Sequence, residues 1–199
     1  MKLLKLSASL LFLGMISLNS MAQKIKLIEG DLAPLAGESS LIVKFVYDDM
    51  RVGKFDRESD YIAKKKEDYN KKEPGRGDTW EKNWVGDRER EYEPKFVDLF
   101  DKSGNISISR KKPAKYTLVF KTTFTEPGYN VYVTRKNAVI NAEAWIVETG
   151  KERVIAKISI TKAPGRTYGG YDYDTGVRIA ECYAISGKKL AKFIKKKAK

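Results

Sequence analysis

Alternating apolar and polar positions predict most of the β-structure of this chain. Apolar residues take every second position in 116–120, in 140–146 and again in 154–160, which is the period of a strand with one buried face. Between the last two segments lies Glu148-Thr149-Gly150-Lys151, whose composition is typical of a tight turn. The two segments therefore predict an antiparallel hairpin. Residues 129–133 are a candidate for a further short strand.

An earlier segment, residues 41–47, is apolar on both of its faces. Leu41, Val43 and Phe45 share one face, and Ile42 lies on the other. A strand at the edge of a sheet needs only one apolar face, so this pattern predicts an inner strand that is covered on both sides.

Four further regions predict helices. The first covers 58–72 and ends at the helix-breaking sequence Glu73-Pro74-Gly75. A second begins near Asp78, which can cap it, and a short one ends near Ser103-Gly104 after a break or new first turn at Pro94. The last begins at Asp174 or Thr175, and its apolar residues recur at helical spacing: Ile179, Tyr183, Leu190 and Ile194.

Gly187 interrupts the apolar pattern of the last helix. Glycine lowers helix propensity, so we expect it to permit either close packing or a bend.

The order of the predicted elements indicates the fold class. A strand, helices, several antiparallel strands and a last helix favour an α+β two-layer sandwich. We expect a mainly antiparallel sheet of four to five strands packed against two to three helices. Residues 23–199 have the length of one domain and contain no internal repeat.

The first 22 residues have the three-part layout of a secretory signal peptide. Lys2 and Lys5 precede an apolar run over 6–16, and Ser20-Met21-Ala22 supplies small residues ahead of Gln23. The apolar run is too short to span about 30 Å of hydrocarbon as a helix. We therefore expect cleavage near Ala22/Gln23 and a soluble protein in the periplasm or outside the cell. A buried amino-terminal helix is the alternative.

The chain contains no histidine and a single cysteine, Cys182. Without histidine, neither a Ser-His-Asp nor a Cys-His arrangement can form, and His-ligated metal sites are excluded. Cys182 lies in an apolar helical stretch, which favours a buried small hydrophobe over a reactive thiol. An enzyme is thus disfavoured, and we expect no cofactor and no metal.

Positive charge is concentrated near the carboxyl end. The leader carries two of the 39 basic residues and no acid, so the mature chain has 37 basic and 26 acidic residues and a net charge of +11. Seven lysines, between Lys188 and Lys199, follow Glu181 with no acid among them. This lysine-rich end could bind anionic headgroups, phosphates or nucleic acid. The alternative is that the lysines complement the helix dipole and solvate the surface. The predicted contact residues in it are Lys195, Lys196 and Lys197.

Two aromatic features are further binding candidates. Trp80 and Trp84 could stack on sugar rings or bases, although their spacing of four residues also suits packing of one helix face onto the sheet. Residues 163–174 form a Gly- and Tyr-rich loop, in which the tyrosines supply contact area at low entropic cost. Its Asp172-x-Asp174-x-Gly176 resembles the start of a calcium loop but lacks the third acid and the distal Glu. The candidate binding residues of the loop are Tyr168, Tyr171 and Tyr173.

A carboxylate pair would support a different function. Asp48 or Asp49 at the end of the first strand, together with Glu58, could form the acid pair of a hydrolase acting on envelope polysaccharide.

Several segments together carry a family resemblance. They are the strand 41–47, the strand 116–120, the hairpin 144–151 and a last helix ending in Gly187-Lys188-Lys189-Leu190-Ala191. In this order they resemble small exported envelope modules, namely the amino-terminal domain of TolB and the penicillin-binding-protein activator lipoproteins. The resemblance implies a non-catalytic, partner-binding α+β module. The chain departs from the lipoproteins because it lacks their lipidated cysteine.

The sequence as a whole favours an exported, soluble, non-catalytic binding or scaffold protein of the bacterial envelope. Its expected partner is an envelope protein or an anionic glycan or lipid. Two alternatives remain open: the carboxylate-based hydrolase, and a charge-driven binder of anionic membrane or nucleic acid.

Overall fold

The computed structural model describes residues 23–131, 133–151, 153–165 and 174–199, so the expected leader lies outside the described residues. In chain order the elements are β1 (Lys24–Gly30), the 3-10 helix η1 (Ala33–Leu35), β2 (Ser40–Val46), β3 (Arg51–Val52), α1 (Glu58–Asn70), α2 (Arg76–Asp87), the π-helix η2 (Arg88–Tyr92), α3 (Glu93–Asp101), β4 (Ser107–Ser109), β5 (Tyr116–Glu126), β6 (Tyr129–Asn130), β7 (Arg135–Lys136), β8 (Ala138–Glu148), β9 (Val154–Gly165) and α4 (Thr175–Lys197).

Seven strands form one mixed sheet, which confirms the α+β class. Its order is β1-β9-β8-β5-β2-β4, and β3 pairs with β5 beside the end of β2. The long ladders of β1, β9, β8 and β5 are antiparallel, whereas β2 runs parallel to both of its neighbours. The sheet has more strands than the expected four to five, because β1 and the short β3 and β4 join it as well.

The predicted hairpin and inner strand are both present. In the β8–β9 ladder, Ala144 pairs with Ile158 and Ile146 with Ala156. The inner strand is β2, which lies between β5 and β4. The predicted cover on both sides is wrong, because Leu41 and Val43 on one face are buried whereas Lys44 on the other face is exposed. The short strand predicted over 129–133 corresponds to β6, which forms a separate two-stranded sheet with β7.

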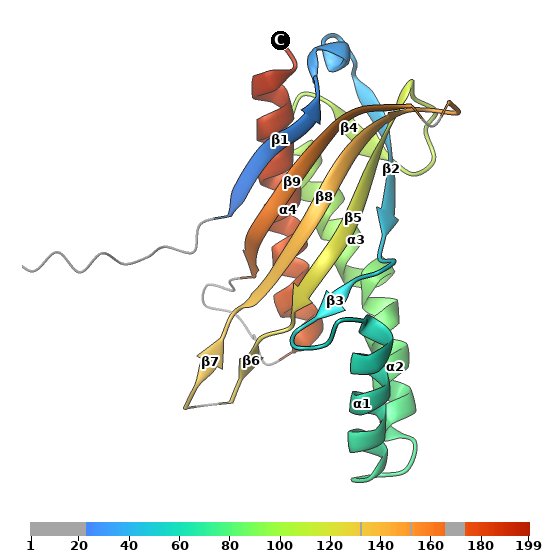
Figure 1. The fold of residues 1–199 in the computed structure, drawn as a ribbon, viewed down its shortest axis with the longest axis vertical. Helices are drawn as coiled ribbons and strands as arrows, with labels where there is room; N and C mark the ends of the chain where they lie inside the picture. The colour runs from blue at the N-terminus through green and yellow to red at the C-terminus, as the bar shows by residue number, and fades with distance from the viewer. Residues whose placement is uncertain (1–22, 132, 152, 166–173) are drawn as a thin grey trace, which may run out of the picture.

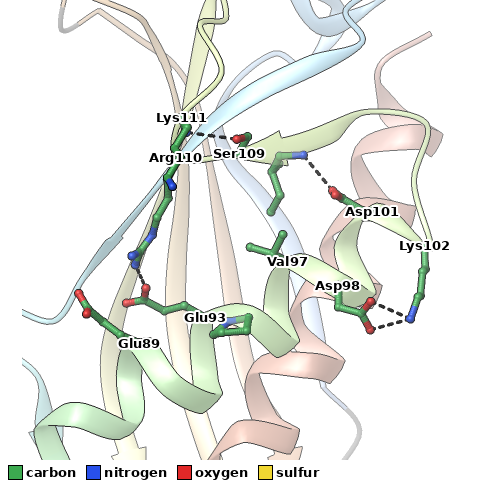
Figure 2. A pocket seen from close by; sticks show the side chains of 11 residues that line it. Glu89, Glu93, Val97, Asp98, Asp101, Lys102, Ser109, Arg110 and Lys111 are labelled. Atoms are coloured by element: carbon green, nitrogen blue, oxygen red, sulfur yellow. Dashed lines mark hydrogen bonds and ion pairs between the residues drawn. The ribbon is translucent and has the colours of Figure 1, made fainter.

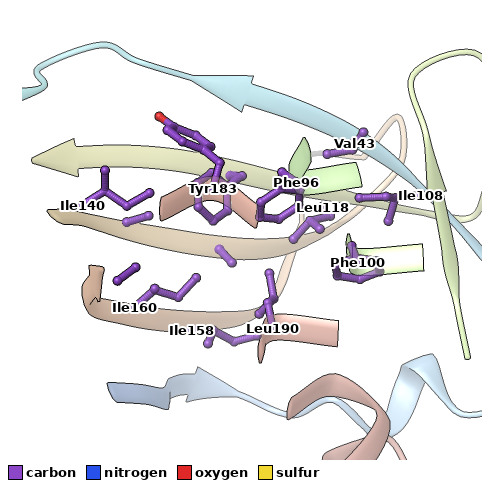
Figure 3. Packing of buried hydrophobic residues seen from close by; sticks show 14 of the residues in the cluster. Val43, Phe96, Phe100, Ile108, Leu118, Ile140, Ile158, Ile160, Tyr183 and Leu190 are labelled. Carbon is purple, nitrogen blue, oxygen red and sulfur yellow. The ribbon is translucent and has the colours of Figure 1, made fainter. Parts of the chain in front are cut away.

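One face of the large sheet carries the core. Figure 1 shows α3 and α4 against this face, and the α1–α2 hairpin extending beyond one end of the sheet. Alternate residues of the strands face these two helices. Leu118 of β5 and Ile158 and Ile160 of β9 are fully buried, and so is Leu190 on the α4 side (Figure 3). Burial of one sheet face under two helices is the arrangement that the strand alternation predicts.

Helix α4 is continuous through Gly187. A Cβ on Gly187 would lie 2.3 Å from the carbonyl oxygen of Phe96 in α3, so only glycine allows the two backbones to approach this closely. Of the two expectations for Gly187, close packing is the one observed. Cys182, on the same helix, is buried as expected, and burial raises the pKa of its thiol.

The helical path from α2 to α3 passes through one turn of π-helix. Pro94 lies in the first turn of α3, so it begins a helix rather than breaking one. The turn η2, which places Arg88 over the ring of Tyr47 and stacks Tyr92 on Tyr183 of α4, was not predicted. Such π-turns recur at functional sites, which directs attention to the residues around it.

Candidate functional site

The lysine-rich end of α4 is presented by a helix whose other side is locked into the core. Asp174 caps the helix by accepting a hydrogen bond from the backbone N–H of Val177 at 3.0 Å, as predicted. Leu190, Ala191 and Ile194 are buried. The lysines before, between and after them are exposed, and we call them the basic end: Lys188, Lys189, Lys192, Lys195, Lys196, Lys197 and Lys199.

Among the residues that the structure describes, no lysine of the basic end has an ion-pair partner. Many lysines elsewhere on the described surface do form ion pairs. In the α1–α2 hairpin, for example, Lys66 bridges Asp78 and Glu81 at 2.9 Å each, and the two hydrogen bonds raise the pKa of this lysine. Exposed lysines without an ion-pair partner also occur elsewhere in the described part of the chain, for example Lys24, Lys44 and Lys82. What distinguishes the basic end is its density of charge, because residues 188–199 hold seven lysines and no acid. Such a concentration of like charge attracts anions more strongly than isolated or paired surface charges do.

A groove of about 840 Å³ opens between α3 and the segment around β4 (Figure 2). Two ion pairs lie along it: Arg110 pairs with the buried Glu93, and Lys102 pairs with Asp98. Glu89 and Lys111 also line the groove, and neither forms an ion pair with a described residue. Asp101 accepts a hydrogen bond from the backbone N–H of Ile108 at 2.9 Å. The groove therefore has a largely apolar lining with paired and unpaired charges along it.

The turn that follows α3 packs against the last part of α4. A Cβ on Gly104, two residues after Lys102, would lie 3.2 Å from the Cβ of Ala191. Figure 1 also shows the carboxyl terminus of α4 at the same end of the molecule as η1 and the β8–β9 turn.

The π-turn holds a second polar cluster. The guanidinium of Arg88 contacts both oxygens of the Glu58 carboxylate at 2.5 Å, and the indole N–H of Trp84 donates to the same carboxylate at 2.7 Å. Arg88 also lies over the ring of Tyr47, 4.2 Å from its centroid. These contacts join α1, α2 and η2 to Tyr47, the residue that follows β2, so they hold the helical hairpin beside the end of that strand.

Buried hydroxyls surround this cluster. Tyr47 donates to Glu93 at 3.1 Å, and the Tyr183 hydroxyl lies 2.7 Å from that of Thr122. Burial raises the pKa of both tyrosines well above the ordinary value, so they stay neutral and act as hydrogen-bonding groups.

The proposed hydrolase carboxylates do meet in space. Asp48, Asp49 and Glu58 line one hollow of about 310 Å³, together with Arg88. Glu58, however, already binds Arg88 and Trp84, and Asp49 lies 3.3 Å from the ammonium of Lys121. Fixed ion-pair contacts of this kind favour a structural role for Glu58 over proton transfer.

The two tryptophans occupy different environments. Trp84 is buried and stacks on Trp80 at 5.6 Å, and both contact Tyr61 of α1 rather than the sheet face. Trp80 is partly exposed and lines a hollow of about 560 Å³ with Arg76, Thr79 and Asn83, among others. Trp80 is accordingly the tryptophan with access to a ligand.

Of the remaining predicted contact residues, the lysines lie in the described part of the chain and the loop tyrosines lie outside it. Lys195, Lys196 and Lys197 are exposed at the basic end. The loop tyrosines Tyr168, Tyr171 and Tyr173 lie outside the described residues. Sequence reasoning did not find Arg88, Glu93 or Arg110, since each meets its partner across a long stretch of chain and lies in no recognisable motif.

Within the described part of the chain, no group of three or more His, Cys, Asp or Glu side chains is arranged to hold a metal ion. Over the same residues, no helix combines the length and the apolar character needed to cross a membrane.

Comparisons with known proteins give likeness in shape only. No family model and no curated protein matches the chain. The solved structures it resembles include a PelC dodecamer from Paraburkholderia phytofirmans, with 13% identity and a TM-score of 0.41 over 87% of this chain and 98% of that one. They also include protein XCC0632 from Xanthomonas campestris, of family DUF330, with 12% identity and a TM-score of 0.41 over 80% of this chain and 85% of that one. Likeness this weak carries no argument about function or assembly, and the resemblance to TolB and the activator lipoproteins stays a prediction.

Proposed function

We propose that this protein is an exported, non-catalytic binding protein of the bacterial cell envelope that captures an anionic partner on the basic end of α4. The observation that carries the proposal is the set of exposed lysines without ion-pair partners on a helix anchored in the core. The segment order shared with exported envelope modules and the leader-like first 22 residues support the location.

The electrostatics favour binding over a merely solvating role. A cation in the last turn of a helix gains at most about 1 kcal/mol from the helix dipole when exposed, and the gain falls off within that turn. Lys188, Lys189 and Lys192 precede the last turn, so the dipole does not account for them. Their mutual repulsion is relieved when an anionic surface approaches, and each lysine then contributes about 1 kcal/mol to binding.

The test removes charge at the basic end and measures binding to two anionic probes. We expect the variant with Lys195, Lys196, Lys197 and Lys199 replaced by Gln to lose affinity for vesicles of phosphatidylethanolamine and phosphatidylglycerol, for a uronic-acid polysaccharide, or for both. At about 1 kcal/mol per lysine the loss reaches about a thousandfold at low salt. Co-sedimentation measures the vesicles, and calorimetry measures the glycan.

A matched control removes the same charge elsewhere. Lys64, Lys71, Lys136 and Lys151 are exposed and each is ion-paired, so their replacement by Gln should leave affinity nearly unchanged. Both variants should keep the parent melting temperature, since the altered side chains are exposed. Equal affinity of the two variants, or no binding of the parent protein to either probe, would refute the proposal.

A further inference from the structure

Gln23 carries a buried side-chain amide without a hydrogen-bond partner. The residue is 8% exposed, and neither Oε1 nor Nε2 meets a donor or acceptor among the described residues. Other buried polar side chains are satisfied, since Ser186 donates to the carbonyl of Cys182 at 2.7 Å and Thr122 bonds Tyr183. The buried hydroxyl of Tyr92 also has no hydrogen-bond partner in the described part of the chain, but Gln23 leaves both its donor and its acceptor unpartnered there. An unpartnered buried amide is unfavourable, and it calls for an explanation.

The position of Gln23 is set by strand β1. Lys24 pairs with Thr161 of β9, so Gln23 directly precedes the first paired residue. Strand alternation places Gln23 on the same face as Ile25 and Leu27, which pack against the core under α4, whereas Lys24 is exposed on the other face. The side chain is thus directed toward an apolar layer.

Gln23 is also the residue that follows the expected leader. Cleavage after Ser20-Met21-Ala22 makes it the amino-terminal residue, with an α-ammonium group next to the carboxamide. The mature chain would then hold an additional positive charge at a position that is already short of polar partners. Burying an unpaired ammonium is more unfavourable than burying the amide alone.

We propose that Gln23 of the mature protein is converted to pyroglutamate, an inference that rests on the proposed export. The unprotonated α-amine attacks the side-chain carbonyl carbon Cδ, a bond forms between the α-nitrogen and Cδ, and the Cδ–Nε2 bond breaks. Nε2 leaves as ammonia, and a five-membered lactam remains. The reaction is intramolecular, changes no oxidation state and consumes no co-reactant.

The lactam suits the site better than the open residue. It carries no charge at the amino terminus, and it replaces an ammonium and a carboxamide by one N–H and one C=O. Its ring methylenes supply apolar surface toward α4, on the side of Ile25 and Leu27. Ring closure precedes docking of β1, because the amine and Cδ must be free to approach one another.

The experiment uses the full chain expressed with its leader in an exporting bacterium, followed by intact-mass and amino-terminal peptide measurements. We expect a chain that begins at residue 23, is lighter by one ammonia and resists amine-labelling reagents. A Gln23→Ala chain, processed at the same bond, should instead label at its amino terminus. Pyroglutamyl aminopeptidase should remove the lactam at least about tenfold more slowly from the folded protein than from its released amino-terminal peptide.

The possible results separate this inference from the proposed function. A chain that begins at Gln23 with a free amine overturns the lactam and leaves export and binding intact. A chain that keeps its leader overturns both the lactam and the proposed export. Equal removal of the lactam from the folded protein and from the peptide overturns its buried position.

Discussion

Replacing Gly187 by Ala should destabilise the protein, although alanine is the better helix former. An ideal Cβ at this position lies 2.3 Å from the carbonyl oxygen of Phe96 and 3.1 Å from its carbonyl carbon, whereas ordinary contact begins at 3.4 Å. Both atoms belong to the backbone of α3, which cannot turn aside as a side chain can. Helices α3 and α4 must therefore separate by about 1 Å, a distance that overpacked cores resist.

The magnitude follows from two opposing effects. Alanine gains about 1 kcal/mol over glycine in helix propensity. Overpacking a well-filled interface costs about 1–3 kcal/mol, and the separation also weakens contacts of the buried Phe96, Phe100 and Leu190. We expect a net loss of about 1–2 kcal/mol, which lowers the melting temperature of a domain of this size by about 2–8 °C.

Thermal and urea unfolding of the purified variant measure this loss, with Gly86→Ala as the matched control. A Cβ on Gly86, also helical, meets only the guanidinium end of Arg90, at 3.0 Å and 3.7 Å, and that flexible side chain can move. The control should therefore be unchanged or stabilised by up to about 1 kcal/mol. A Gly187→Ala variant at least as stable as the parent would refute the close-approach argument.

Two further predictions concern the buried polar groups. Glu58→Gln keeps an acceptor for Trp84 but leaves Arg88 without its anion, so we expect a loss of about 1–3 kcal/mol in urea unfolding. The double variant with Arg88→Met should lose less than the sum of the two single variants, and strict additivity would contradict the pairing. Tyr47 and Tyr183 have pKa values above the unfolded value of about 10, so their contribution to stability is present below that pH and is lost as pH rises beyond it. In a tyrosinate absorbance titration these two residues should ionise only as the protein unfolds, and ionisation of all 11 tyrosines near pH 10 in the folded protein would disprove their burial.

Local pattern was sufficient for the elements whose neighbours are close in sequence. The β8–β9 hairpin follows from alternation on either side of a turn, and Ile158 and Ile160 are buried because they fall on the apolar phase of that alternation. The cap at Asp174 is equally local, since its partner Val177 is three residues away.

The pairing of strands and charges that are far apart in sequence could not be predicted, and the reason is physical. Nothing within residues 41–47 specifies that β2 runs parallel to both β5 and β4, because a strand with two apolar faces suits many neighbours. The pair Glu58–Arg88 spans 30 residues, and its geometry depends on the π-turn. Charged residues without a motif therefore showed their roles only in the folded chain.

The candidate site shows the same division. Exposure of Lys195, Lys196 and Lys197 follows from helical spacing around Leu190 and Ile194. The absence of described acids able to pair with them depends on how distant segments pack, and that information is not local. Trp80 and Trp84 share a helix face as predicted, but only the structure shows that Trp80 is the one beside a hollow.

Strand β1 has a consequence for the order in which the molecule can form. It is the first strand among the described residues, and there its ladder is with β9, where Ile25 pairs with Ile160. A chain synthesised from its amino terminus cannot complete this sheet until nearly all of its residues have been made, and α4, which covers the core face, comes later still. Such late closure keeps a newly made chain unfolded for longer, and an unfolded chain is the form that the export proposed above would require. The β1–β9 ladder therefore delays completion of the fold as well as closing one edge of the sheet.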